Sequence, residues 1–144
     1  MSSTTPNAQY NLAASGSAAD RLATVVRRRM FALLMDELAP SPGHRILDVG
    51  ATSDQTYESS NYLEAWYPYP PRITATGIDD ASHLERRYPG VRFVPGDGRS
   101  LPFEDRSFDI VHASAVIEHV GTRDDQARFL AELWRVARVG IMVT

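Results

Sequence analysis

The sequence predicts an α/β fold in which a doubly wound, mostly parallel sheet carries helices on both faces, giving three layers. Short apolar runs alternate with helical patterns along the chain, and each run ends in a glycine or a polar turn. The run at residues 108–116 is apolar almost throughout, as expected for a central parallel strand that is buried on both faces. No internal repeat is present to indicate a solenoid.

Length and composition indicate one globular domain with a small-molecule partner. The chain has 144 residues, of which 43% are hydrophobic, enough for a single core. Its formal net charge of −3 gives no broad basic surface, so nucleic acid is not expected as a partner. The absence of cysteine excludes disulfides, thiolate zinc sites and cysteine nucleophiles. The histidines are not spaced for metal binding, so no metal is expected either.

Residues 1–19 are predicted to form a flexible N-terminal tail ahead of a domain that spans residues 20–144. The tail is rich in small polar residues and offers little apolar surface to bury. It also lacks the basic and apolar regions of a signal peptide, and no apolar run reaches the roughly 18 residues of a membrane-spanning helix. We therefore expect a cytoplasmic protein without a membrane partner.

An amphipathic helix is predicted over residues 20–38, leading into an α/β core at 45–144. Asp20 is a suitable N-cap, and Pro40 and Pro42 stop the helix. The three arginines at 27–29 point in different directions on a helix, and we expect them to face solvent. The apolar positions recur at helical spacing and are Leu22, Val25, Val26, Met30, Phe31, Leu33, Leu34 and Leu38.

The core is predicted to contain five strands, at residues 46–49, 73–79, 91–94, 108–116 and 139–143. Short helices are expected at 58–66 and 81–88. A longer helix starts after Thr122, where Asp125 completes a capping-box pattern. Five aromatic residues between positions 57 and 69 either pack the first short helix onto the sheet or line a pocket.

Acidic side chains and a glycine mark the carboxyl ends of the first three strands. The first strand contains Asp48 and runs into Gly50, where the lack of a Cβ allows positive φ and the close approach of a ligand. Asp79 ends the second strand, with Asp80 as a second candidate, and an acid there can bind both hydroxyls of a ribose. Asp97 ends the third strand and can accept a hydrogen bond from an exocyclic amine. Because these strand ends lie side by side in a parallel sheet, they predict a site for an adenosine moiety.

In four motifs the chain resembles the class I S-adenosylmethionine-dependent methyltransferases, most closely their methyltransferase domain 11 type. The resemblance covers residues 46–143, and its most specific part is the strand at 107–111 followed by Glu118 and His119. The motifs are Leu47-Asp48-Val49-Gly50, Gly77-Ile78-Asp79, Gly96-Asp97-Gly98 with Leu101-Pro102-Phe103, and Ser107-Phe108-Asp109-Ile110-Val111 running to Val116-Ile117-Glu118-His119.

The resemblance implies a Rossmann-like methyltransferase fold, S-adenosyl-L-methionine as cofactor, S-adenosyl-L-homocysteine as product and methyl transfer to a small-molecule acceptor. It also implies that His119 or Glu118 takes a proton from the acceptor, or instead orients the strand end. The implied cofactor-binding residues are Asp48, Gly50 and Ala51 beside the methionine part, Asp79 and Asp80 at the ribose, Asp97 and Gly98 at the adenine, and Ser114 near the methyl group.

Other functions remain open at this point. Thr52 and Asp54 stand where this family has glycines, so the alternative is a non-catalytic relative that acts as an interaction module. The family's sheet has seven strands, and we expect a chain truncated after its fifth. A missing C-terminal segment or a second copy in a homodimer would then cover the open edge. A nicotinamide-dependent oxidoreductase is disfavoured because the Gly-x-Gly-x-x-Gly loop is absent.

Overall fold

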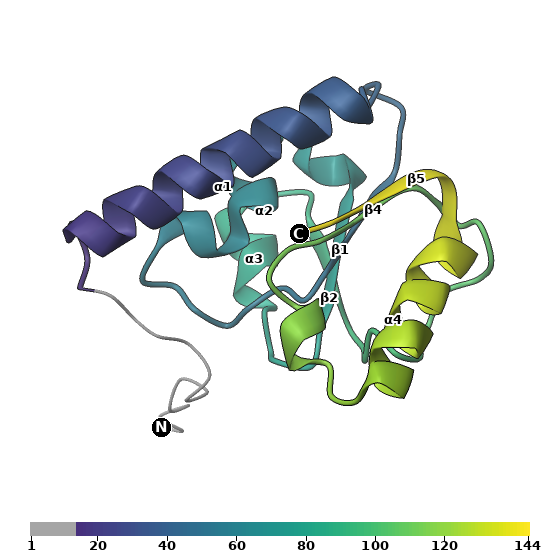
Figure 1. Ribbon diagram of the computed structural model, residues 1–144. Coiled ribbons are helices and arrows are strands. Elements are labelled where there is room, and N and C mark those ends of the chain that lie inside the picture. The colour runs from purple at the N-terminus through teal and green to yellow at the C-terminus, as the bar shows by residue number, and fades with distance from the viewer. Residues whose placement is uncertain (1–13) are drawn as a thin grey trace.

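The computed structural model describes residues 14–144, which form a five-stranded parallel sheet covered by helices (Figure 1). All four neighbouring strand pairs are parallel. The chain builds outward from β1 to one side and then to the other, as the predicted doubly wound class requires. The strands are β1 (Ile46–Val49), β2 (Ile73–Gly77), β3 (Arg92–Pro95), β4 (Phe108–Ala113) and β5 (Ala137–Val143), in the order β3-β2-β1-β4-β5.

Helices lie on both faces of the sheet, which confirms the three-layer prediction. One face carries α1 (Ala18–Glu37), α2 (Tyr62–Trp66) and α3 (His83–Arg87), and the other carries α4 (Arg123–Val136) (Figure 1). Short 3-10 turns at η1 (Glu58–Asn61), η2 (Pro70–Arg72) and η3 (Ile117–His119) complete the connections. Within residues 14–144, no helix is long and apolar enough to cross a membrane.

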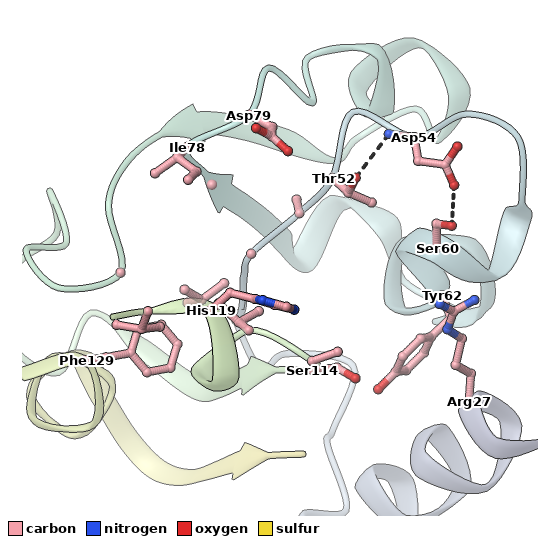
Figure 2. Close-up of a pocket in the computed structure, with 18 of the residues that line it drawn as sticks. Arg27, Thr52, Asp54, Ser60, Tyr62, Ile78, Asp79, Ser114, His119 and Phe129 are labelled. Carbon is pink, nitrogen blue, oxygen red and sulfur yellow. Dashed lines mark hydrogen bonds between the residues drawn. The ribbon is translucent and has the colours of Figure 1, made fainter. Parts of the chain in front are cut away.

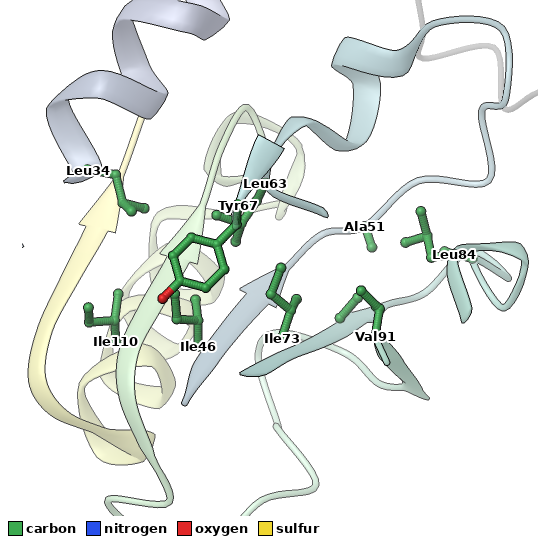
Figure 3. Close-up of a cluster of buried hydrophobic side chains, with 11 residues drawn as sticks. Leu34, Ile46, Ala51, Leu63, Tyr67, Ile73, Leu84, Val91 and Ile110 are labelled. Atoms are coloured by element: carbon green, nitrogen blue, oxygen red, sulfur yellow. The ribbon is translucent and has the colours of Figure 1, made fainter. Parts of the chain in front are cut away.

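Alternation along β1 sends its side chains into two separate cores. Ile46 packs beneath α1, α2 and α3 in the cluster that Figure 3 shows, whereas Leu47 and Val49 pack with Phe129 of α4. Asp48 points to the same face as Ile46, because side chains two residues apart share a face of the sheet. A carboxylate is thereby placed at the border of an otherwise apolar layer.

The first helix begins earlier than predicted. Ser17, not Asp20, is its N-cap: the Ser17 hydroxyl accepts a hydrogen bond from the Asp20 backbone at 3.2 Å. The Asp20 carboxylate in turn accepts one from the Gly16 backbone at 2.8 Å, so Asp20 supports the cap from within the first turn. Residues 18 and 19, assigned to the tail by prediction, are therefore helical, while residues 1–13 of that predicted tail lie outside the described residues.

The predicted apolar face of α1 is only partly buried. Leu34 is fully buried in the core, with Phe31, Met35 and Leu38 packed around it. The sheet-facing side of the C-terminal half therefore carries the packing, and the remaining apolar residues point away from it. Four of the apolar positions at helical spacing are exposed: Leu22, Val25, Val26 and Leu33.

One arginine of α4 organises the loop between β3 and β4. The Arg135 guanidinium donates to the backbone carbonyls of Leu101 and Phe103 at 3.0 and 2.7 Å. Glu132 accepts from the Leu101 backbone N–H at 2.7 Å and also pairs with Arg135. The predicted capping box at the other end of α4 is confirmed, since Thr122 and Asp125 exchange both hydrogen bonds. The helix is thus tied to the loop that carries the second part of the third motif.

Candidate functional site

A cavity of about 520 Å³ opens at the carboxyl ends of the central strands (Figure 2). Its walls are the loops after β1, β2 and β4, residues 96–99 after β3, the N-terminal half of α1, and single residues of η1, α2, η3 and α4. Open α/β sheets bind ligands at this edge, where the direction of strand succession reverses. The volume lies within the range of about 300–1,000 Å³ that is typical of small-molecule sites.

The structure brings most of the predicted cofactor residues to this cavity. Asp48 lies behind the wall, beside a smaller cavity of about 20 Å³. Asp80 is not part of the wall, and its carboxylate instead accepts a hydrogen bond from the Ser82 backbone at 2.9 Å ahead of α3. The predicted residues that line the cavity are Gly50, Ala51, Asp79, Asp97, Gly98 and Ser114.

The two predicted proton acceptors in η3 are separated by the fold. His119 lines the cavity, whereas Glu118 does not. Both side chains are exposed, so neither is held in one orientation by packing. Only His119 is therefore placed to meet a bound molecule.

The loop after β1 needs a glycine at one position only. Gly50 has φ 94°, and a Cβ there would lie 2.2 Å from Cγ2 of Val116. Neither Thr52 nor Asp54 has positive φ. The side-chain amide of Asn61 pairs with the backbone of Thr52. The loop thus takes a conformation that residues other than glycine adopt readily, held by side chains from η1.

Asp54 is an ionised group at the mouth of this loop. Burial raises its pKa, but hydrogen bonds from the Ser60 hydroxyl and the Thr56 backbone outweigh burial and leave the pKa below its usual value. The Asp54 backbone N–H donates to the Thr52 hydroxyl at 3.1 Å. Asp54 therefore both fixes the loop and adds negative charge to the cavity wall (Figure 2).

The carboxylate of Asp97 is already engaged. The Arg99 guanidinium donates to both of its oxygens, at distances of 2.7–3.2 Å. These hydrogen bonds, together with one from the Arg99 backbone, lower the pKa of Asp97 below its usual value. An adenine amine that bound Asp97 would share this carboxylate with Arg99 or displace it.

Arg27 also lines the cavity, which corrects the prediction that it faces solvent. Its guanidinium donates to the Ser59 hydroxyl at 2.8 Å and lies beside Tyr62 in Figure 2. Its neighbour Arg28 stacks over the Trp66 ring at 4.1 Å, while the side chain of Arg29 is exposed. Among the described wall residues, four carboxylates stand against two guanidinium groups: Asp20, Asp54, Asp79 and Asp97 against Arg27 and Arg99.

Three buried side chains from three elements form a hydrogen-bonded chain at the back of the site. Asp48 of β1 lies 2.6 Å from Nδ1 of His112 in β4. Nε2 of the same ring lies 2.7 Å from the hydroxyl of Tyr62 in α2. The three residues are 7%, 2% and 3% exposed, and Tyr62 is also part of the cavity wall.

A second carboxyl group borders this chain. Glu64 is fully buried, and as a carboxylate neither of its oxygens has a hydrogen-bond partner. Burial raises the pKa of Glu64 well above its usual range, and so do the negative charge of Asp48 and a hydrogen bond to it. These effects favour the neutral form of Glu64, which can donate a hydrogen bond to Asp48.

Sequence reasoning missed Arg27, His112 and Tyr62 as wall or supporting residues. The aromatic run did contain a signal, since both interpretations of it are correct for different rings. Tyr67 packs in the core, Tyr57 lines the cavity, and Tyr62 does both. Their roles follow from positions in space rather than from spacing in the chain.

Comparisons with known proteins agree with the motifs. A family model described as a methyltransferase domain matches residues 47–143. A demethylmenaquinone methyltransferase of Renibacterium salmoninarum is 32% identical over 116 residues, covering 78% of this chain and 45% of that protein. A phthiotriol/phenolphthiotriol dimycocerosates methyltransferase of Mycobacterium tuberculosis is 47% identical over 79 residues, covering 50% of this chain and 27% of that protein.

A solved structure extends the likeness to three dimensions. The YcgJ protein of Bacillus subtilis superimposes with a TM-score of 0.58 at 26% identity, covering 77% of this chain and 47% of the other. The chain spans less than half the length of each of these three proteins. Family match, sequence identity and fold agree: the chain belongs to the class I S-adenosylmethionine-dependent methyltransferases.

Proposed function

We propose that this chain binds S-adenosylmethionine in the 520 Å³ cavity and takes part in methyl transfer to a small-molecule acceptor. The observation that carries the proposal is the convergence of four strand-end residues on one cavity: Gly50, Asp79, Asp97 and Ser114. They come from four different strands and stand in the order that the family motifs imply.

The charges of the cavity suit this cofactor. S-adenosylmethionine supplies a methyl group on a positively charged sulfonium, which an acceptor attacks in line. Four carboxylates in the wall favour a ligand with positive charge, and Asp79 can accept hydrogen bonds from both ribose hydroxyls. Arg27 offers the complementary group for the cofactor's carboxylate, on the same side as the β1 loop.

The acceptor we infer is an apolar molecule with oxygen substituents. Val116, Val120 and Phe129 make one part of the cavity wall apolar. Two similar proteins are named for demethylmenaquinone and phthiotriol, which supports an acceptor of this general kind. An apolar wall beside Ser114 would exclude water and hold such a molecule near the transferred methyl group.

Calorimetric titration with S-adenosylhomocysteine tests the cofactor proposal. We expect one binding site in the wild type, weaker binding by about tenfold or more in Asp79→Asn, and unchanged binding in Asp80→Asn. Asp80 is the matched control because it neighbours Asp79 but lies outside the cavity wall. Absence of binding to a folded sample would reject the proposal.

Transfer itself is measured with methyl-labelled S-adenosylmethionine and 1,4-naphthohydroquinone as the acceptor. Label in the organic extract that depends on the protein and is inhibited by S-adenosylhomocysteine supports the proposed activity. If the protein binds the cofactor but transfers no methyl group to 1,4-naphthohydroquinone, simple alcohols or amines, the proposed methyl transfer is rejected and only cofactor binding stands.

A further inference from the structure

The hydroxyl of Tyr62 connects the cavity to the buried chain through His112 to Asp48. Tyr62 is the one member of that chain whose side chain also lies on the wall of the large cavity. In Figure 2 its hydroxyl points toward Ser114, the residue at the end of β4 that is implied to lie near the methyl group. A molecule in the acceptor position would therefore meet a tyrosine whose other partner is a histidine.

Either ring nitrogen of His112 can carry the proton in these contacts, and the relay requires the arrangement in which Asp48 accepts. An ionised Asp48 can only accept, so Nδ1 of His112 carries the proton of their 2.6 Å contact. Nε2 then has a free lone pair, and the Tyr62 hydroxyl donates to it at 2.7 Å. In this arrangement Nε2 of His112 can accept the Tyr62 proton when the Tyr62 oxygen takes up a proton from another molecule.

The surroundings of Tyr62 favour the protonated form of its hydroxyl before the acceptor reacts. Burial raises the pKa of Tyr62 to about 12, although a hydrogen bond with Ser114 opposes the shift. Tyr62 therefore does not act as a preformed anion. It can accept a proton only while it passes its own proton to His112, so the two transfers belong to one step.

Glu64 sets the charge behind the histidine. In its favoured neutral form it adds no second carboxylate beside Asp48. One carboxylate balances the one positive charge that His112 gains on protonation. The ring contacts Asp48 from β1 and Tyr62 from α2. Glu64 of α2 interacts with Asp48, and Arg27 of α1 with Tyr62.

A second space adjoins the same groups. The 20 Å³ cavity is lined by Asp48, Tyr62, His112 and Ser114, together with Gly50 of the β1 loop. This volume is sufficient for one water molecule, and its walls offer several polar partners. The proton-carrying groups and the cofactor loop therefore share a border.

We propose that Tyr62, His112 and Asp48 form a proton relay that deprotonates a hydroxyl group of the methyl acceptor. Tyr62 is the catalytic residue that touches the acceptor, His112 receives the proton, and Asp48 is a positioning residue. The proposal rests on the methyltransferase function proposed above and adds to it the class of acceptor, a weakly acidic O–H compound such as a phenol, hydroquinone or enol.

The step balances as follows in atoms and charges. The acceptor O–H bond breaks and its proton bonds to the Tyr62 oxygen, while the Tyr62 proton moves to Nε2 of His112. The acceptor keeps the electron pair of its O–H bond and uses it, directly or through its conjugated carbon, to form the new bond to the methyl carbon. The methyl–sulfur bond of a bound S-adenosylmethionine would break in the same step, with its electron pair staying on the sulfur of the departing S-adenosylhomocysteine. His112 becomes an imidazolium beside Asp48 and later returns the proton through Tyr62 to water in the emptied cavity.

Tyr62→Phe tests the relay and Tyr67→Phe serves as its matched control. Both tyrosines are 3% exposed, but Tyr67 is not part of the cavity wall and its hydroxyl has no hydrogen-bond partner. With 1,4-naphthohydroquinone we expect kcat to fall about 100-fold or more in Tyr62→Phe and to stay unchanged in Tyr67→Phe. Affinity for S-adenosylhomocysteine is expected to stay within twofold of wild type in both variants.

The pH profile separates a relay from a packing role. In Tyr62→Phe, activity should recover as the pH rises to where the hydroquinone ionises in solution, because an ionised acceptor needs no base. His112→Gln should show the same recovery. A uniform loss at every pH, or a loss that follows a lowered melting temperature, would overturn the relay.

Nitrogen-15 NMR of the histidines gives a readout that needs no acceptor, with His112 assigned by comparison with His112→Gln. We expect the neutral form with the proton on Nδ1, and an Nε2 shift that changes in Tyr62→Phe but not in Tyr67→Phe. An imidazolium or an Nε2-protonated ring at neutral pH would overturn the proposal. Absence of cofactor binding by the wild-type protein would instead reject the methyltransferase function. Failure of the relay and failure of that function are therefore distinguishable.

Discussion

The side-chain amide of Asn61 brackets the backbone of Thr52: its Oδ1 accepts from the Thr52 N–H at 3.0 Å, and its Nδ2 donates to the Thr52 carbonyl at 3.0 Å. Both residues are buried, so these hydrogen bonds form away from water. The Asn61 side chain of η1 thus makes the two backbone hydrogen bonds that a neighbouring strand would otherwise make, and so holds the loop that follows β1.

Replacing Asn61 with alanine should loosen this loop. Each buried backbone group left without a partner costs about 1–3 kcal/mol, so we expect the free energy of unfolding to fall by about 2 kcal/mol or more in urea denaturation. Affinity for S-adenosylhomocysteine should fall as well. Gln55→Ala, at an exposed position of the same loop, is the control and should leave both quantities unchanged.

Restoring family-like glycines at Thr52 and Asp54 should weaken the site. Neither position has positive φ, and both side chains take part in the hydrogen bonds that hold the loop. The double glycine variant gains backbone entropy in the unfolded chain and loses these contacts, so we expect lower stability, by about 1–3 kcal/mol, and weaker binding of S-adenosylhomocysteine. Tighter binding by the variant would instead support the non-catalytic interaction module, whose loop had lost its cofactor.

Arg27→Met should lower the affinity for S-adenosylhomocysteine by about tenfold, because the cofactor's carboxylate would lose a charge-assisted hydrogen bond worth about 1.5–3 kcal/mol. Methionine keeps much of the side chain's apolar length. Arg29→Met makes the same change two residues away at an exposed position and should have no effect in calorimetry. Equal losses in both variants would show that helix charge alone matters and would contradict a contact by Arg27.

Glu64→Gln should make the protein more stable at neutral pH. The folded-state pKa of Glu64 is raised above its ordinary value of 4.5, so wild-type stability declines as the pH rises above that value and the folded state holds a proton that the unfolded state releases. Glutamine resembles the neutral acid and does not titrate. Urea denaturation between pH 5 and 8 should show a gain that grows with pH, whereas a gain independent of pH would contradict a neutral Glu64.

Local patterns in the sequence were sufficient to predict the five strands and the strand ends that carry site residues. The runs at 46–49 and 108–116 are apolar enough to be recognised, although the second of these strands ends at Ala113, three residues earlier than predicted. Thr122 with Asp125 marks the start of α4. Asp79 and Asp97 reach the cavity because parallel strands end at one edge, which topology alone dictates. These features depend on neighbours in the sequence or on the fold class.

Features that depend on contacts across the chain could not be predicted. His112 and Tyr62 are 50 residues apart, and His112 and Asp48 are 64 apart, so no spacing brings them together. Leu22 and Leu33 of α1 are exposed although they fit the helical spacing, because periodicity does not specify how much of an apolar face the rest of the fold covers. Helical geometry places Arg27 and Arg29 on different sides of α1, but only the packing of the helix shows that Arg27 is the one at the cavity.

The position of Asp48 directly opposite His112 in the ladder between β1 and β4 has a consequence for folding specificity. A slip of one residue would set the aspartate against Val111 or Ala113 and turn the imidazole to the opposite face. Both polar groups would then be buried without partners, whereas an all-aliphatic pair of strands would tolerate the shift at little cost. The pair therefore selects the native register of the two central strands. A substitution at His112 should affect the assembly of the sheet as well as the site at its edge.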